Sequence, residues 1–284
     1  MPTNADIAKL KGHAIFFITH IFNHDVERRF LKIVNDIRWI SDVFICAPSN
    51  LAVPKKYQNV TIFFDINAIY GYGSDGKTRG YSNHLHYLPV FINKQFNNYD
   101  YHWYFEYDVI YTGNWLEVIM STINDDSDLI SINLYNIGHP GARKWIWWDS
   151  FKPPFDIGEN NTFRALLSSF RISSKWITIA ERLILEWWQG IYEAILPSGL
   201  SYYKCKLSQL GWQGSHVPDD RVGLFYKNYP VIFTALGDFR VRPQHYFLLK
   251  SNTLYHPVKT GLNKISWFRH ILLMFFQYFI YFIK

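Results

Sequence analysis

The first 65 residues alternate between short apolar runs and one longer helical pattern. Residues 14–18 (AIFFI) form an apolar run of strand length, and residues 43–46 and 60–64 are two further runs of this kind. Between the first two runs, apolar side chains recur on one face of a helix, at Val26, Phe30, Ile33, Val34 and Ile37. Asn23 and Asp25 are suitable N-caps for that helix. The order strand, helix, strand, strand predicts an α/β sheet.

The middle of the chain continues this alternation and then loses it. The pattern predicts a helix over residues 85–96, a strand over 101–105, a short helix over 115–123 and a strand over 129–134. Between residues 136 and 174, glycine and proline interrupt both the helical and the strand periodicity of apolar residues, so we expect a large loop region there. Apolar residues recur at helical spacing from Trp176 to Ile191, which predicts one helix with a buried stripe that ends at Pro197.

The last segment is a short apolar run with basic residues before it. Residues 271–283 contain Gln277 as their clearly polar residue, and as a helix they would reach roughly 20 Å, short of the roughly 30 Å of a bilayer core. We therefore expect a helix that lies in the membrane interface. A true span and a core or oligomer-contact helix are the alternatives. This divides the chain into one α/β domain over 1–260 and a membrane-associating helix over 261–284.

Composition and charge restrict the partners. With 49% hydrophobic and 18% charged residues, the chain is too apolar for intrinsic disorder. A net charge of +6 without a basic run suits an anionic ligand or membrane face, and we expect no nucleic-acid partner. The two cysteines, Cys46 and Cys205, form no disulfide framework, which favours a reducing compartment. The start of the chain lacks the apolar region of a secretory signal, so we expect a cytoplasmic location, peripheral on the inner face of the membrane.

The strongest chemical signal is a pair of acids at the end of a predicted strand. Glu106 and Asp108 follow an aromatic run, and a Gly-Asn turn comes after them in YHWYFEYDVIYTGNW. Ligands gather at the carboxyl ends of strands in α/β sheets. Carboxylate oxygens suit Mg²⁺ or Mn²⁺, with phosphate oxygens completing the shell. The alternative is a pair of solvated acids at a strand edge.

This acidic stretch resembles the motif of the GT-A class of nucleotide-sugar-dependent glycosyltransferases. The residues WYFEYDVIYTGNW resemble an E-x-D-x-x-x-T-G version of the family's Asp-x-Asp motif, with Glu106 at the first position, and LYHPVK near the C-terminus is the second similar stretch. The resemblance extends over residues 14–259. It implies a mixed, mostly parallel sheet flanked by helices, a Mn²⁺ or Mg²⁺ ion held by Glu106, Asp108 and His256, and a diphosphate contacted by Lys259.

The loop over residues 71–83 is the candidate nucleotide cradle. Its glycines allow backbone N–H groups to approach an anion, and Lys77 and Arg79 add positive charge. Asp75 or Asp65 would bind the base or ribose. The P-loop spacing is absent, and a plain surface loop is the alternative.

Two places offer a catalytic base in addition to Asp108. Glu193, in YEAILPSGL, resembles the Glu-x-x-x-Pro segments beside acceptor sites in similar transferases, and Asp219 and Asp220 in GSHVPDD are the other option. A carboxylate there would take the proton of the acceptor hydroxyl in an inverting transfer. The structural alternatives are a solvated helix end and a turn or helix cap. Three tryptophans in the predicted loop region are candidate acceptor contacts, namely Trp145, Trp147 and Trp148.

These features together predict a metal-dependent glycosyltransferase. It would move a sugar from a nucleotide-diphosphate donor to a glycan or lipid-linked acceptor, in surface polysaccharide or glycolipid assembly. A non-catalytic glycan-binding or membrane-adaptor protein on a transferase-like fold is the alternative. A two-metal phosphodiesterase is disfavoured, since a second cluster of histidines and aspartates is lacking.

Overall fold

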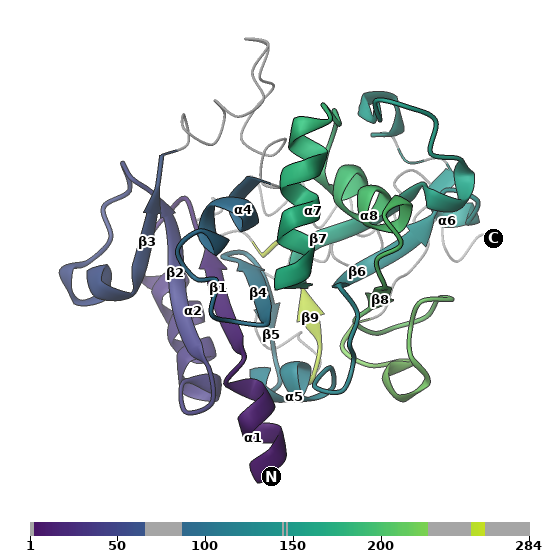
Figure 1. Cartoon of the computed structure of the whole chain (residues 1–284). Helices are drawn as coiled ribbons and strands as arrows, with labels where there is room; N and C mark the ends of the chain where they lie inside the picture. Colours follow the sequence, from purple (N-terminus) through teal and green to yellow (C-terminus); the bar gives the residue numbers. More distant parts are fainter. Residues whose placement is uncertain (1–2, 66–86, 144, 146, 227–250, 259–284) are drawn as a thin grey trace, which may run out of the picture.

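A computed structural model describes residues 3–65, 87–143, 145, 147–226 and 251–258 of the 284-residue chain (Figure 1). The main sheet has seven strands in the order β3-β2-β1-β4-β7-β6-β8. They are β1 (His13–Ile18), β2 (Asp42–Pro48), β3 (Thr61–Phe64), β4 (Tyr101–Glu106), β6 (Leu129–Asn136), β7 (Phe163–Ser173) and β8 (Leu207–Gln209). A second, two-stranded sheet pairs β5 (Ile110–Tyr111) with β9 (Leu254–Tyr255).

The main sheet is mixed and mostly parallel. Strands β3, β2, β1 and β4 pair in parallel, as do β6 and β8, whereas β7 is antiparallel to both β4 and β6. Strands β4 and β6 therefore run in the same direction, and their carboxyl ends lie at the same edge of the sheet. The predicted α/β sheet is confirmed at this level.

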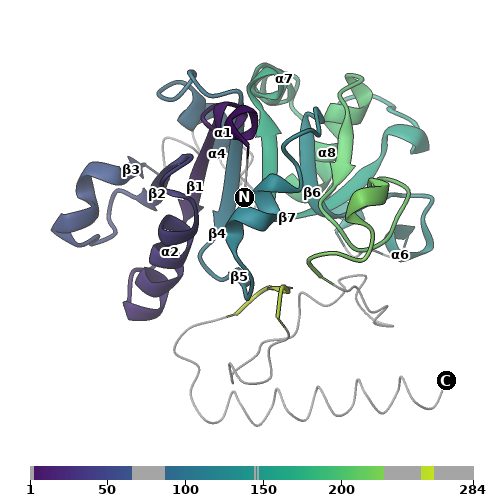
Figure 2. The same cartoon turned by 90° about the horizontal axis from the view of Figure 1, so that it is seen from below.

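Helices cover both faces of the sheet. They are α1 (Asn4–Leu10), α2 (His24–Ile37), α4 (Tyr87–Asn93), α5 (Trp115–Met120), α6 (Pro140–Arg143), α7 (Ser174–Leu185) and α8 (Tyr192–Tyr202), with short 3₁₀ turns η1 (Lys55–Val60), η3 (Trp148–Ser150), η4 (Glu159–Asn161) and η5 (Asp219–Arg221). Alternate residues of β1 pack to opposite sides: Phe16 lies with α4, α7 and α8, and Phe17 lies with α2 and α5. Figure 2 shows α2 and α7 on opposite sides of the sheet.

The first third of the chain follows the sequence pattern closely. Strands β1, β2 and β3 lie where the three apolar runs predict them. Helix α2 begins after Asn23, whose side chain accepts a hydrogen bond from the backbone N–H of Val26 and so caps the helix. Its buried side chains include Val26, Phe30 and Ile33, as the predicted stripe requires.

Strand β7 corrects the prediction of a loop between residues 136 and 174. All eleven residues of β7 are buried, because the strand lies between β4 and β6 with both faces covered. Buried polar residues, among them Arg164, Ser168 and Arg171, interrupt its apolar residues, so the strand shows neither a continuous apolar run nor a period-two alternation. The segment before it does contain short turns and irregular chain, as predicted.

The predicted single helix from Trp176 to Ile191 is also wrong. Helix α7 ends at Leu185, a turn follows, and α8 begins at Tyr192 with Pro197 inside it rather than at its end. Trp187 adopts a left-handed φ of 62° in the turn and is exposed, whereas Trp176 and Trp188 are buried. Gly190 has a φ of 125°, and a Cβ there would meet the carbonyl oxygen of Ser150 at 2.6 Å. Apolar residues keep their helical spacing across this turn, so the sequence pattern does not reveal the break between the two helices.

Some expectations concern residues beyond the described part. The loop over 71–83 and the helix over 261–284 lie outside it, so the proposed division at residue 260 stays a prediction. Among the described residues, no helix combines the length and hydropathy needed to cross a bilayer. Cys46 and Cys205 are both free and buried, which confirms that they form no disulfide.

We predict that the aromatic cluster of Phe16, Phe44 and Tyr104, on the same face of the sheet as α4 and α7, contributes strongly to the free energy of unfolding. Phe16 is fully buried and stacks on Phe44 and Tyr104, with ring centroids 5.6 and 5.3 Å away. Phe16→Ala should lower the free energy of unfolding by about 3–5 kcal/mol in urea titrations. Phe63→Ala, at an exposed position of the edge strand β3, is the matched control and should cost far less. Equal losses would contradict this packing.

Candidate functional site

A tight turn after β4 places two carboxylates together. The backbone N–H of Val109 donates to the carbonyl oxygen of Glu106 at 3.0 Å, so the chain reverses directly after the strand. The N–H of Tyr107 donates to the carbonyl of Ile18 at 2.8 Å and holds the turn against β1. The side chain of Asp108 is 2% exposed and that of Glu106 is 21% exposed. The acids therefore lie at the carboxyl end of the central strand.

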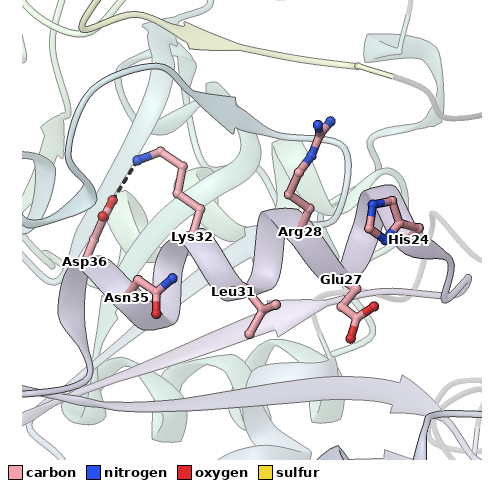
Figure 3. A pocket seen from close by; sticks show the side chains of 7 residues that line it. All are labelled: His24, Glu27, Arg28, Leu31, Lys32, Asn35 and Asp36. Carbon is pink, nitrogen blue, oxygen red and sulfur yellow. Dashed lines mark hydrogen bonds and ion pairs between the residues drawn. The ribbon is translucent and has the colours of Figure 1, made fainter.

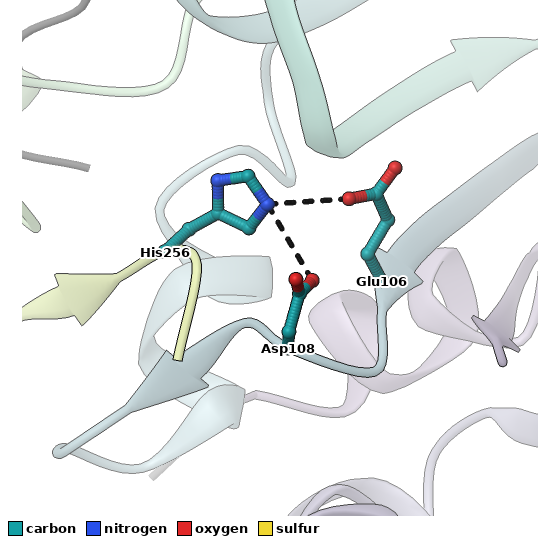
Figure 4. A group of neighbouring side chains, drawn as sticks. All are labelled: Glu106, Asp108 and His256. Carbon is teal, nitrogen blue, oxygen red and sulfur yellow. Dashed lines mark ion pairs between the residues drawn. The ribbon is translucent and has the colours of Figure 1, made fainter. Parts of the chain in front are cut away.

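The short segment around β9 brings a histidine to these acids. Strand β9 pairs antiparallel with β5, which directly follows the turn, and the N–H of Val258 donates to the carbonyl of Asp108 at 2.8 Å. As a result, Nε2 of His256 lies 3.3 Å from Oε2 of Glu106 and 3.4 Å from Oδ1 of Asp108 (Figure 4). The structure thus brings together the three residues predicted as metal ligands.

The donor set fits a divalent cation. One ligand atom from each of Glu106, Asp108 and His256 lies within 4.8 Å of the other two. Two carboxylates and an imidazole are oxygen and nitrogen donors of the kinds that divalent cations bind in proteins. Glu106 and His256 are partly exposed, whereas Asp108 is buried.

The two acids hold His256 in its charged form when no cation is bound. Burial lowers the pKa of His256, but the hydrogen bonds and negative charges of Asp108 and Glu106 outweigh burial and raise this pKa to about 9. The imidazolium therefore balances the carboxylates near neutral pH. A metal ion that bound here would have to displace the proton.

Helix α8 adds a second carboxylate-bearing segment to the same site. The hydroxyl of Tyr192 donates to Oε1 of Glu106 at 3.3 Å, and Glu193 follows it in the first turn of the helix. Burial and the negative charge of Glu106 raise the pKa of Glu193 to about 7, although the charges of His256 and Arg164 oppose the shift. Glu193 is therefore poised to exchange a proton near neutral pH. The sequence pattern indicates Glu193 but gives no signal for Tyr192.

A buried arginine interacts electrostatically with Glu193. Arg164, at the start of β7, has its guanidinium 5.4 Å from the ring centroid of Tyr135 and 5.6 Å from that of Trp145. Burial lowers the pKa of Arg164 to about 10, and the charges of Tyr135 and Glu193 oppose this. Trp145 is thus a buried partner of Arg164, which does not fit its predicted contact with an acceptor.

The other two predicted acceptor contacts differ in exposure. Trp147 is exposed, and its neighbour Trp148 is half-buried, with its indole N–H donating to the carbonyl of Ala142 at 2.7 Å. Of the three loop tryptophans, Trp147 is therefore the one with a face free to contact a ligand.

The structure does not bring Asp219 and Asp220 to this site. Both are exposed in η5, which is anchored by the buried Arg221. Arg221 forms an ion pair with Asp125, which precedes β6 and so lies at the opposite end of the parallel strands from Glu106. This placement gives no support to a catalytic role for either aspartate.

The predicted nucleotide-binding residues are only partly described. Asp65 is exposed directly after β3, at the same edge of the sheet as Glu106 but separated from β4 by two strands. Asp75, Lys77, Arg79 and Lys259 lie outside the described residues. Their roles stay predictions.

A shallow groove along the exposed side of α2 is a separate feature (Figure 3). Its lining residues include Lys32 and Asp36, which pair with each other at 2.9 Å, and Arg28, which pairs with Asp25 at 3.3 Å. Positive and negative side chains therefore neutralise each other along the helix. This groove lacks the concentrated charge of the site at β4.

We predict that the affinity for Mn²⁺ rises with pH. His256 must lose its proton to become a ligand, so binding between pH 6.5 and 8.5 should strengthen by up to about tenfold per pH unit. Titration of the free Mn²⁺ signal by electron paramagnetic resonance measures this. His256→Gln removes the titrating group and should show weaker binding with a flatter pH dependence. A flat dependence in the wild-type protein would contradict the role of His256.

Comparison with known proteins finds likeness in structure alone. No model of a protein family matches the chain, and no curated protein matches its sequence. Among solved structures, the galactosyltransferase LgtC, in complex with donor and acceptor sugar analogs, is 10% identical, with 89% of this chain and 91% of that chain covered and a TM-score of 0.48.

Two further structures are similar to smaller extents. The 4-diphosphocytidyl-2C-methyl-D-erythritol synthase of Anaerococcus prevotii DSM 20548 is 9% identical over 78% of this chain and 92% of that chain, with a TM-score of 0.43. The glycosyltransferase GlyE of Streptococcus pneumoniae TIGR4 is 10% identical over 69% of this chain and 44% of that chain, with a TM-score of 0.35. At these scores the likenesses carry no conclusion about activity.

Proposed function

We propose that the protein is a metal-dependent glycosyltransferase of GT-A type that takes its sugar from a nucleotide-diphosphate donor. The observation that carries this proposal is the convergence of Glu106, Asp108 and His256 at the carboxyl end of the central parallel strand. Ligands of α/β sheets bind at this edge. The group of oxygen and imidazole donors suits a cation that also binds phosphate oxygens.

Each residue of the site has a role in such a transfer. Glu106, Asp108 and His256 would hold Mn²⁺ or Mg²⁺, and the bound cation would stabilise the negative charge of the departing diphosphate. The Tyr192 hydroxyl orients Glu106 through its hydrogen bond. Lys259, next to the described Val258, is the proposed contact of the diphosphate. Asp65, Asp75, Lys77 and Arg79 are the proposed contacts of the nucleotide.

Glu193 is the proposed base for the acceptor hydroxyl. Its raised pKa, near 7, lets the carboxylate accept a proton at neutral pH, and its charge interacts with those of Glu106 and His256. Asp219 and Asp220, the other candidates, lack this proximity. We therefore favour Glu193.

The acceptor is proposed to be a glycan or a lipid-linked sugar. The apolar, basic-flanked sequence at residues 261–284 supports a peripheral location on the cytoplasmic face of a membrane, where lipid-linked acceptors are found. Assembly of a surface polysaccharide or glycolipid fits this arrangement.

Nucleotide binding tests the proposed function. In calorimetric titrations with UDP, GDP, CMP and dTDP, one nucleotide should bind in the presence of Mn²⁺ and lose at least about tenfold in affinity without it. Asp108→Asn, which keeps the buried shape, should cause a similar loss. Asp126→Asn, at an exposed carboxylate, is the control and should bind as the wild type does. If folded wild-type protein bound none of the four, the transferase would be contradicted and a non-catalytic adaptor favoured.

Glu193→Gln tests the proposed base. This variant keeps the side-chain shape, so donor affinity should stay unchanged while turnover falls by about 10²–10⁴-fold. Wild-type turnover should decrease at acidic pH, because Glu193 becomes protonated, and the midpoint should lie below the pKa of about 7 of the metal-free protein, since the bound cation neutralises Glu106. Nucleotide release measured against pH gives both results. Unchanged turnover in the variant would remove Glu193 from the mechanism.

A further inference from the structure

Arg29 interrupts the apolar stripe of α2 at the level of the site. Its neighbours on the buried face include Val26, Phe30 and Ile33, yet Arg29 itself is only 8% exposed. Its Nη1 atom donates to two main-chain carbonyl oxygens, that of Tyr107 at 2.9 Å and that of Val258 at 2.8 Å. One guanidinium nitrogen therefore joins two segments that are far apart in the sequence.

These two carbonyls belong to the segments that carry the proposed ligands. Tyr107 lies between Glu106 and Asp108 in the turn after β4, and Val258 lies two residues after His256. A main-chain hydrogen bond, from Val258 N–H to the carbonyl of Asp108, also joins the two segments. Arg29, on α2, therefore links the turn that carries the acidic pair to the segment that carries the histidine.

We propose that Arg29 is the positioning residue of the Glu106–Asp108–His256 group. This inference rests on the proposed metal-dependent function, because it assigns to Arg29 the alignment of the three ligands. Burial of a guanidinium has a desolvation cost, and Nε of Arg29 has no hydrogen-bond partner among the described residues. An apolar side chain would fill the stripe of α2 without this cost. The function that requires an arginine is the bridge between the two carbonyls.

The effect on a bound cation follows from geometry. Ligand atoms must be held to within about 0.5 Å of their productive positions, and residues that orient ligands typically contribute 10–100-fold to metal affinity. Without Arg29, the β5–β9 pairing would still keep His256 near the acids. The two carbonyls would lose their shared donor, however, and the turn and the histidine segment could move apart.

The experiment compares two buried arginines in the full chain. Arg29→Met should weaken Mn²⁺ binding by about 10–100-fold in the electron paramagnetic resonance titration. Arg29→Lys should recover much of this loss, because an ammonium group can donate to both carbonyls. Arg171→Met is the matched control, since Arg171 is fully buried and donates to the carbonyls of Thr122 and Ser127, away from the site. It should lower stability and leave Mn²⁺ affinity unchanged.

Hydrogen exchange of the metal-free protein separates this inference from the proposed function. The Val258 amide, which donates to Asp108, should exchange faster in Arg29→Met than in wild type or Arg171→Met. If Arg29→Met fails to fold, Arg29→Lys should still show a smaller loss of both affinity and protection. Wild-type Mn²⁺ affinity or unchanged Val258 protection in the Arg29 variants would overturn the positioning role. A wild-type protein that bound no Mn²⁺ would instead contradict the proposed function, and exchange would still decide the role of Arg29.

Discussion

The site depends on balancing two negative charges that the fold holds close together. Glu106 and Asp108 lie on one side of a turn at the carboxyl end of β4, and Asp108 is almost completely buried. Such a pair repels itself and requires a cation nearby. His256 supplies that cation as an imidazolium when it is protonated, and a divalent metal can replace its proton. The pairing of β5 with β9 and the bridge through Arg29 both serve to bring this histidine to the acids.

The surrounding scaffold explains why this edge of the sheet carries chemistry. Strand β7 runs antiparallel between β4 and β6, so its beginning, with Arg164 paired to Tyr135, lies beside the carboxyl end of β6 and extends past the carboxyl end of β4. Helix α8 packs against β7 and presents Tyr192 and Glu193 to the same region. A site built from strand ends and a helix start on a packed sheet is held more rigidly than one built from loops alone. The raised pKa of Glu193 is a consequence of this shared burial.

The sequence predicted the elements that show either a one-sided apolar stripe or an uninterrupted apolar or aromatic run. Helix α2 has its apolar stripe and its Asn23 cap, and the aromatic run before Glu106 marks β4. Strand β7 was missed because buried polar residues such as Arg164 and Arg171 interrupt its apolar residues, whereas the equally buried β1 is a continuous apolar run. The break between α7 and α8 was missed because Trp187 and Trp188 continue the apolar spacing through a turn.

For the site, residue chemistry indicated Glu106 and Asp108, and the resemblance at LYHPVK added His256, but neither indicated what aligns the three. Tyr192 acts through a contact between segments distant in the sequence. Arg29 did leave a signal, as a charged residue at a buried position of the stripe of α2. What the arginine contacts depends on tertiary structure, which periodicity does not encode.

Anomalous X-ray diffraction from a crystal of the protein soaked in Mn²⁺ tests the central claim most directly. A manganese peak held jointly by carboxylate oxygens of Glu106 and Asp108 and by Nε2 of His256 is the expected result. The peak should disappear in crystals of Asp108→Asn. A soaked crystal with His256 still paired to both acids and no manganese between them would contradict the account.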